Sequence, residues 1–162
     1  ICRACELASA NLDEMRTREG AKLAADLLLR KDLFREIVDR IEARAPLVAK
    51  EYTEKLYARI KEITEDTIEV PEERILTETA IFADKSNITE ELVRLDSHID
   101  QLGKFLTADD GPAGKKLDFL IQEMNREANT IGSKSNDLEV TSHMLDAKAE
   151  IEKIREQVQN IE

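Results

Sequence analysis

Hydrophobic residues return every three or four positions along almost the whole chain. From residue 23 to residue 63 the series is Leu23, Leu27, Phe34, Ile37, Ile41, Ala45, Val48, Tyr52, Leu56, Ile60 and Ile63. This spacing places apolar side chains on one face of a helix, with charged residues on its flanks, and it is close to coiled-coil patterning. No segment alternates with period two. The pattern therefore predicts an all-α protein built from long amphipathic helices.

The composition agrees with long helices. The chain has 162 residues, with only five Gly, three Pro and no Trp. Because large aromatic residues are scarce, the core must consist mainly of Leu, Ile, Val and Ala packed between helices. A chain of this length fits one domain, or one compact domain with an arm.

The first part of the chain, residues 1–70, is expected to form a helical arm. Pro46 lies inside its apolar stripe, and a proline inside a helix removes one backbone hydrogen bond and clashes with the preceding turn. We therefore predict a kink or a break near Ala45. Gly20 marks a weaker point, between a first short helix and the arm from Gly20 to Thr64.

The second part, residues 71–162, is expected to form a helical bundle or hairpin that carries the candidate site. Pro71 suits the first position of a helix that runs to about Ala83. Asn87, with Glu90 three residues later, has the spacing of a capping box. The helix that it opens has apolar residues at heptad spacing, which are Leu92, Leu95, Ile99, Leu102 and Leu106.

Two more helices are expected after the segment TADDGPAG. Pro112 can begin the first of them, and Asn136 with Glu139 again has capping-box spacing before the last. The last helix has an uninterrupted stripe, which is Val140, Met144, Ala147, Ile151, Ile154, Val158 and Ile161.

The charge of the chain limits the ways in which it can bind nucleic acid. The formal net charge is -11, which argues against binding by bulk positive charge. It leaves room for a local site in which carboxylates hold a divalent cation. No run of 18 apolar residues and no secretory signal is seen. The lone pair Cys2 and Cys5 lacks further zinc ligands nearby, so we interpret both as incidental thiols in a reducing cytoplasm.

Titratable residues gather on two neighbouring helices. Glu91 and His98 are seven residues apart, hence on one face, with Arg94 between them. On the next helix Glu123 and Glu127 are four residues apart. Two like charges at this spacing repel each other unless a cation or an arginine offsets them.

A short connection makes two helices antiparallel neighbours, so Glu91, His98, Glu123 and Glu127 could converge. Carboxylate oxygens with one imidazole suit Mn²⁺ or Mg²⁺, and such an ion could activate water for phosphodiester cleavage. His98 could act as an acid or base instead of a ligand. The alternative is a solvated or salt-bridged face, and spacing alone favours that alternative.

Basic residues near two turns are candidates for phosphate contact. GPAGKK is not a Walker A motif, but a Gly-rich turn before a helix, with Lys115 and Lys116, offers N–H groups and positive charge. The alternative is an ordinary turn with solvated lysines. Lys134, between Ser133 and Ser135, either contacts phosphate or marks a bend. We interpret His143, beside the last apolar stripe, as structural.

Three long strings in the second part resemble the C-terminal half of the YicC/YloC family of bacterial proteins. They are NITEELVRLDSHIDQL, GPAGKKLDFLIQEMNREANTIGSKSNDLEVT and IEKIREQVQNIE, within residues 72–162. EMRTREGAKLAADL resembles the family's central helical region more loosely. Gly103 departs from the family, where a longer polar side chain often stands. The family's N-terminal domain is not in this sequence, which begins with Ile, so we expect a C-terminal fragment that ends at the natural terminus.

The resemblance implies a metal-dependent endoribonuclease of the bacterial cytoplasm that acts on RNA as a ring-like homo-oligomer, a hexamer. The residues that correspond to the family's polar signature are Glu90, Glu91, Arg94, His98, Glu123, Asn125, Arg126, Glu127, Asn129, Ser133, Lys134 and Ser135. The catalytic residues would be His98, Glu123 and Glu127, and Glu91 would join them as a metal ligand. RNA phosphates would meet Arg94, Lys115, Lys116, Asn125, Arg126, Asn129, Ser133, Lys134 and Ser135.

Two hypotheses follow. In the first, the chain is the catalytic part of a hydrolase that cleaves RNA with Mn²⁺ or Mg²⁺. In the second, it is a non-catalytic helical module that oligomerises or presents RNA or partners to another nuclease, as its long charged arm suggests. The absence of the N-terminal domain leaves open whether this part alone is active.

Overall fold

The computed structural model describes residues 2–64, 71–108 and 114–159. These residues form five α-helices and no strand, which confirms the all-α prediction. The helices are α1 (Cys2–Thr64), α2 (Glu72–Lys85), α3 (Thr89–Thr107), α4 (Gly114–Lys134) and α5 (Leu138–Val158).

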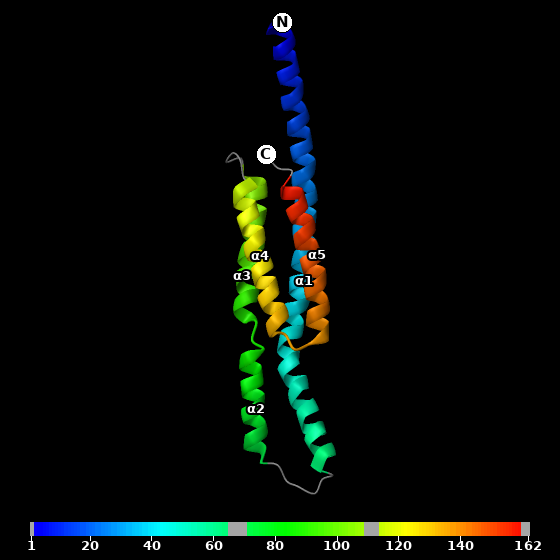
Figure 1. Cartoon of the computed structure of the whole chain (residues 1–162), viewed down its shortest axis with the longest axis vertical. Coiled ribbons are helices and arrows are strands. Elements are labelled where there is room, and N and C mark those ends of the chain that lie inside the picture. Colours follow the sequence, from blue (N-terminus) through cyan, green and yellow to red (C-terminus); the bar gives the residue numbers. More distant parts are fainter. Residues whose placement is uncertain (1, 65–70, 109–113, 160–162) are drawn as a thin grey trace.

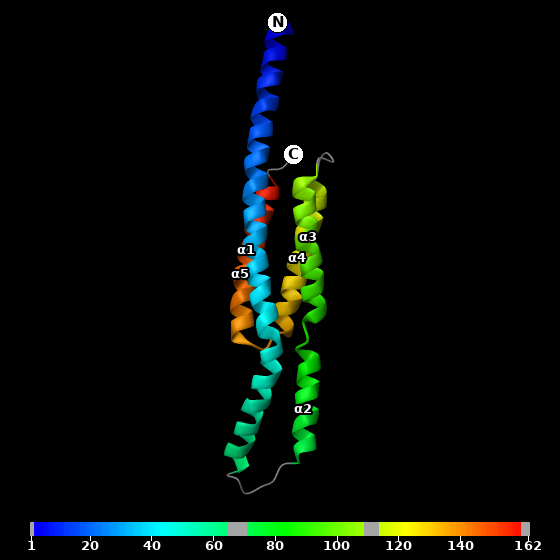
Figure 2. The ribbon, with the colours of Figure 1, turned by 180° about the vertical axis from the view of Figure 1, so that it is seen from behind.

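The helices form an elongated bundle around α1 (Figure 1). The chain runs the length of the molecule in α1 and returns through α2 and α3, which follow one another end to end. Helix α4 then runs antiparallel to α3, and α5 runs antiparallel to both α4 and α1. Figure 2 shows from behind that α1 and α3 cover one side, while α4 and α5 lie on the other.

Helix α1 is continuous over 63 residues, and it passes through both of its predicted weak points. The prediction that Gly20 separates a first short helix from the arm is wrong. At Pro46 the helix is kinked rather than broken, since its axis changes direction in this stretch without a gap in the helix (Figures 1 and 2). A proline removes only one internal hydrogen bond, and the contacts of α1 on both sides of Pro46 compensate for it.

One hydrophobic core joins α1, α3, α4 and α5. Helix α1 contributes Leu27, Phe34, Val38 and Ile41. The predicted stripe of α3 is confirmed, with Leu106 packed at its edge, and the stripe of α5 is buried from Val140 to Val158. Ile161 lies outside the described residues. The core contains residues from both predicted parts of the chain, 1–70 and 71–162.

Helix α2 packs on the second half of α1 and away from the main core. The rings of Tyr52 and Phe82 are stacked, with centroids 3.7 Å apart. Thr53 and Thr79 lie beside them, with their Oγ1 atoms 3.3 Å apart. These contacts place α2 so that α3 can begin at the base of the bundle.

The predicted starts of α2, α3 and α5 are correct to within about two residues, but two caps differ. Asn87 Oδ1 accepts a hydrogen bond from the Thr89 backbone at 3.0 Å, without the expected reciprocal contact from Glu90. The cap of α5 is Asp137 and not Asn136, because Asp137 Oδ1 accepts from the amides of Glu139 and Val140. Pro112 lies outside the described residues.

The first third of α1 projects beyond the bundle. Residues 3–22 are all exposed, and Cys5 is a free thiol among them. Among the described helices, none combines the length and the apolar character needed to cross a membrane.

Candidate metal centre on helices α3 and α4

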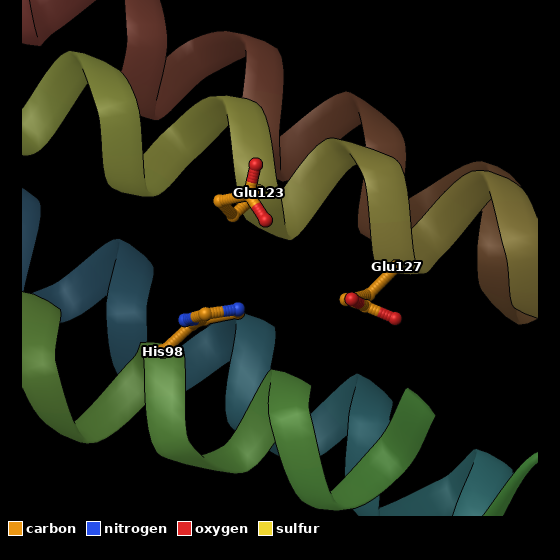
Figure 3. Close-up of side chains that lie close together, drawn as sticks. All are labelled: His98, Glu123 and Glu127. Carbon is orange, nitrogen blue, oxygen red and sulfur yellow. The ribbon is translucent and has the colours of Figure 1, made fainter. Parts of the chain in front are cut away.

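Helices α3 and α4 bury their apolar faces in the core and bring polar side chains together at the edge of their contact. His98 of α3 lies opposite Glu123 and Glu127 of α4 (Figure 3). Each of the three offers one ligand atom, and these atoms all lie within 4.8 Å of one another. The convergence expected from spacing is therefore present for these three residues.

The three side chains differ in exposure. Glu127 is 4 % exposed, and His98 and Glu123 are half-buried. The His98 Nδ1 atom is buried and has no hydrogen-bond partner among the described residues. A buried polar atom without a partner is costly and is usually met by water or an ion.

Arginines flank the cluster on both helices. Arg94 Nη1 donates to Glu127 Oε1 at 3.3 Å, and its Nη2 pairs with Glu90. The pKa of Arg94 is raised, first by the hydrogen bond to Glu90 and then by that to Glu127. On α4, Arg126 Nη1 lies 3.8 Å from Glu123 Oε2. Arg94 therefore holds the buried carboxylate of Glu127, while the exposed Arg126 lies beside the half-buried Glu123.

Glu91 does not join the cluster, contrary to expectation. Its Oε1 accepts a hydrogen bond from Lys134 Nζ at 2.7 Å, and Lys134 also donates to the Asn87 carbonyl. Burial raises the pKa of Glu91, but the hydrogen bond and charge of Lys134, a backbone hydrogen bond and the charge of Arg94 together outweigh burial, so the net pKa is lowered. Lys134 was expected to contact an RNA phosphate, but it instead neutralises the carboxylate of Glu91, which is 4 % exposed.

The two asparagines lie on a different flank of α4 from the cluster. Asn129 Nδ2 donates to Asn125 Oδ1 at 3.2 Å, and both line a groove toward α5. Arg155 of α5 lines the same groove. Sequence reasoning missed Arg155 because it stands on the polar side of the last helix, where its spacing carries no signal.

The remaining predicted residues are spread over α4 and its ends. Lys115 is exposed, and the Lys116 Nζ atom lies 5.9 Å from the centre of the Phe105 ring. Ser133 Oγ donates to the Thr130 carbonyl, and Ser135 Oγ is buried without a partner among the described residues. The His143 Nε2 atom lies 4.0 Å from Glu139 Oε1, and His143 is not among the three residues of the cluster.

The departure at Gly103 is local. A Cβ atom there would lie 3.5 Å from the Lys31 side chain, which is an ordinary contact. A side chain at this position would therefore lie against Lys31.

The donor set of the cluster fits a divalent cation. One imidazole nitrogen and two carboxylate oxygens are ligands that Mn²⁺ accepts, and Mg²⁺ favours the oxygens. Three protein ligands leave coordination positions for water or a substrate oxygen. The convergence of the three side chains is the observation that favours a cation at this point.

Residues 41–162 match the family described as Endoribonuclease YicC-like, C-terminal. This chain belongs to the YicC-like endoribonuclease family. It is 51 % identical over 160 residues to the Probable endoribonuclease YicC of Clostridioides difficile (strain 630), covering 99 % of this chain and 54 % of that protein. It is 34 % identical over 148 residues to the Probable endoribonuclease YicC of Haemophilus influenzae, covering 91 % of this chain and 50 % of that protein. The chain thus spans about half the length of the curated relatives that it matches.

Proposed function

We propose that this chain supplies the catalytic centre of a divalent-metal-dependent endoribonuclease that cleaves RNA phosphodiester bonds. The observation that carries the proposal is the convergence of His98, Glu123 and Glu127 from two helices, within 4.8 Å of one another. Membership of the YicC-like family supports an RNA substrate.

His98, Glu123 and Glu127 would hold the ion, Mn²⁺ or Mg²⁺. When bound, such an ion neutralises charge that develops on a phosphate and lowers the pKa of water. The protein contributes rigidity, because Glu127 is fixed by Arg94 and enclosed by the α3–α4 contact. His98 is also placed for general acid or base catalysis if it faces substrate instead of metal.

Charged and polar groups around the cluster would bind the RNA. Arg126 is exposed beside Glu123, so it can reach a phosphate without disturbing the core. The wider set proposed for RNA contact is Arg94, Lys115, Lys116, Asn125, Arg126, Asn129, Ser133, Lys134 and Ser135. Arg94 and Lys134 would first have to release part of their contact with Glu127 and Glu91. We propose that the whole protein works as a homo-oligomer in the bacterial cytoplasm, a hexamer by family resemblance.

The test combines metal binding with cleavage. Calorimetric titration of the purified protein with Mn²⁺ should show one site, and Glu123→Gln or Glu127→Gln should weaken it at least tenfold. The same variants should lower cleavage of a labelled hairpin RNA at least 100-fold, while the helical circular dichroism signal stays unchanged. Glu78→Gln serves as the matched control, because Glu78 is exposed on α2, outside the cluster.

A chelator separates the two candidate functions. Cleavage that persists in EDTA, or that survives both glutamine substitutions, would contradict a metal centre here. If the full-length protein cleaves no RNA under any divalent ion, the second candidate is favoured: a helical module that assembles copies or presents RNA. The exposed apolar residues of the projecting part of α1, Leu7, Leu12 and Met15, are the observation that supports this alternative.

A further inference from the structure

Helix α4 carries a second row of exposed side chains, which is separate from the cluster. Lys115, Phe119, Gln122 and Arg126 follow one another in steps of four, three and four residues. This spacing places them in one stripe along the helix, here called the α4 stripe. All four are in the exposed or half-buried part of α4, while Leu117, Leu120, Ile121 and Met124 face the core.

Phe119 is the unusual member of the stripe, because its side chain is 64 % exposed. The chain has four phenylalanines. The other three are engaged: Phe34 is in the core, Phe82 stacks on Tyr52, and Phe105 packs against the core beneath Lys116. Phe119 instead presents its ring to solvent, one turn from Lys115 and two turns from Arg126.

A groove runs along the edge of the stripe, between α4 and α5. Gln122 and Arg126 line it together with Asn125 and Asn129, and Arg155 closes it from α5. The groove encloses about 460 Å³ and contains two guanidinium groups and several amides. These are groups that hydrogen-bond phosphate oxygens and the edges of unpaired bases.

Arg126 connects the stripe to the cluster. Its guanidinium lies 3.8 Å from the Glu123 carboxylate, yet the same residue lines the groove. A ligand that occupies the stripe can therefore continue over the surface of α4 to His98 and Glu127. The α4 stripe extends over twelve residues, from Lys115 to Arg126, which is a rise of about 16 Å. That is the length of about five stacked nucleotides at roughly 3.4 Å each.

We propose that the α4 stripe binds a single-stranded segment of RNA, with Phe119 stacking on an unpaired base and Lys115 and Arg126 contacting the flanking phosphates. The proposal deepens the function proposed above, on which its choice of RNA rests. The net charge of -11, and Asp118 on the same side of α4, exclude binding by charge alone. Stacking on an aromatic ring is not weakened by that charge, so Phe119 should contribute most of the affinity.

Affinity for a fluorescent 10-nucleotide single-stranded RNA tests the proposal. The measurement is anisotropy with the 162-residue chain in EDTA, so that cleavage is blocked and binding alone is observed. Phe119→Ala should weaken binding five- to 150-fold, which is the effect of losing one base stack. Phe119→Tyr should retain binding. Leu145→Ala is the matched control, because Leu145 on α5 is also 64 % exposed.

Two further arms identify the contacts. A series of RNAs is prepared, each with one abasic nucleotide at a different position. In the RNA that lacks the base stacked on Phe119, Phe119→Ala should no longer weaken binding. Arg126→Gln should lower the slope of log affinity against log salt by about 0.7, as expected for one phosphate contact on a single strand. A duplex RNA of the same sequence should bind more weakly than the single strand, and single-stranded DNA shows whether the ribose contributes.

Three results would overturn the inference. The first is equal RNA affinity of Phe119→Ala and the unchanged protein, and the second is an equal loss of RNA affinity in Phe119→Ala and Leu145→Ala. The third is a Phe119→Ala variant whose molecular mass in solution changes while its RNA affinity does not. The last would make Phe119 a contact between copies of the chain. These outcomes are distinct from failure of the proposed nuclease. RNA binding that depends on Phe119, in a full-length protein that cleaves no RNA with any divalent ion, would retain the stripe and reject the proposed nuclease.

Discussion

Each of the two buried carboxylates on the α3–α4 interface is paired with one cation from the opposite helix. Glu127 of α4 meets Arg94 of α3, and Glu91 of α3 meets Lys134 of α4. A buried charge is tolerated when a partner and hydrogen bonds offset its desolvation, and removing the partner is expensive. The two pairs therefore hold the register of the helices and keep Glu127 in place beside His98.

Lys134→Met tests this at the level of one residue. The variant should lower the free energy of unfolding at pH 7 by about 1–3 kcal/mol, because it leaves the Glu91 carboxylate buried without its cation. Urea denaturation measures the loss. Lys55→Met is the control, since Lys55 is exposed and lies 3.8 Å from Glu51, so it should change stability by less than about 0.5 kcal/mol.

The same pair predicts a pH dependence. Because the pKa of Glu91 is lowered in the folded protein, its contribution to stability is complete above the unfolded value of about 4.3. It is lost as the pH falls through the lower folded value. Lys134→Met removes the hydrogen bond and the charge of Lys134 while burial remains, so the pKa of Glu91 rises and the loss should begin at a higher pH. Equal acid profiles of the two proteins would contradict the role given to Lys134.

The sequence predicted which residues share a helix face but not which of them meet. Glu91 and His98 lie on one face of α3, yet seven residues separate them along the axis by about 10 Å. Because α4 runs antiparallel to α3, the α4 residue that faces Glu91 must come about two turns later in α4 than the residue that faces His98. Lys134 follows Glu127 by seven residues, so Lys134 is the residue that pairs with Glu91. The cluster therefore contains only the other three predicted ligands, His98, Glu123 and Glu127.

At the scale of the helix, heptad spacing was a better guide than single breaker residues. The stripes of α3 and α5 were predicted almost residue by residue, because long periodic patterns survive local variation. Gly20 was misread, since a glycine weakens a helix without ending it. The cap of α5 was missed by one residue, because Asn136 and Asp137 are both good caps and only the path of the chain decides between them.

Because α1 is continuous through Gly20, replacing this glycine by alanine is predicted to stabilise the helix. A Cβ atom at this position would meet nothing within 4 Å, and both neighbouring turns are helical. Gly20→Ala should therefore stabilise the projecting part of α1 by about 1 kcal/mol, through the lower conformational entropy of the unfolded chain. Hydrogen exchange of the amides of residues 14–24 should slow. Unchanged or faster exchange would show that α1 is not helical here in solution.

The start of α5 offers a comparison between neighbouring caps. Asp137 accepts two backbone hydrogen bonds and also pairs with Arg44 at 2.7 Å, so Asp137→Ala should cost about 1–2 kcal/mol of stability. Asp137→Asn keeps a capping oxygen and loses only the charge, and should cost less. Asn136→Ala should have almost no effect. Thermal unfolding of the three variants measures the order, and a larger loss for Asn136→Ala would reverse the assignment of the cap.

The whole molecule consists of three regions along its length (Figure 1). The four-helix part holds the core, the cluster and the α4 stripe, and α2 with the second half of α1 forms a two-helix extension below it. The first third of α1, in which residues 3–22 are exposed, extends in the opposite direction. The sequence predicted long helices but not this division into regions. An amphipathic stripe indicates that one face of a helix is buried, but it does not identify the element that packs against that face.

Removal of residues 1–20 tests whether the bundle is independent of the projecting part. Residues 3–22 are exposed, so the shortened chain should keep the melting temperature of the bundle within about 2 °C, while its helical signal falls with the residues removed. Sedimentation of both forms at several concentrations provides the control. If the chain associates through Leu7, Leu12 and Met15, deletion should lower its mass and leave Mn²⁺ binding unchanged. A fall in melting temperature that persists at high dilution would instead show that the projecting part stabilises its own bundle.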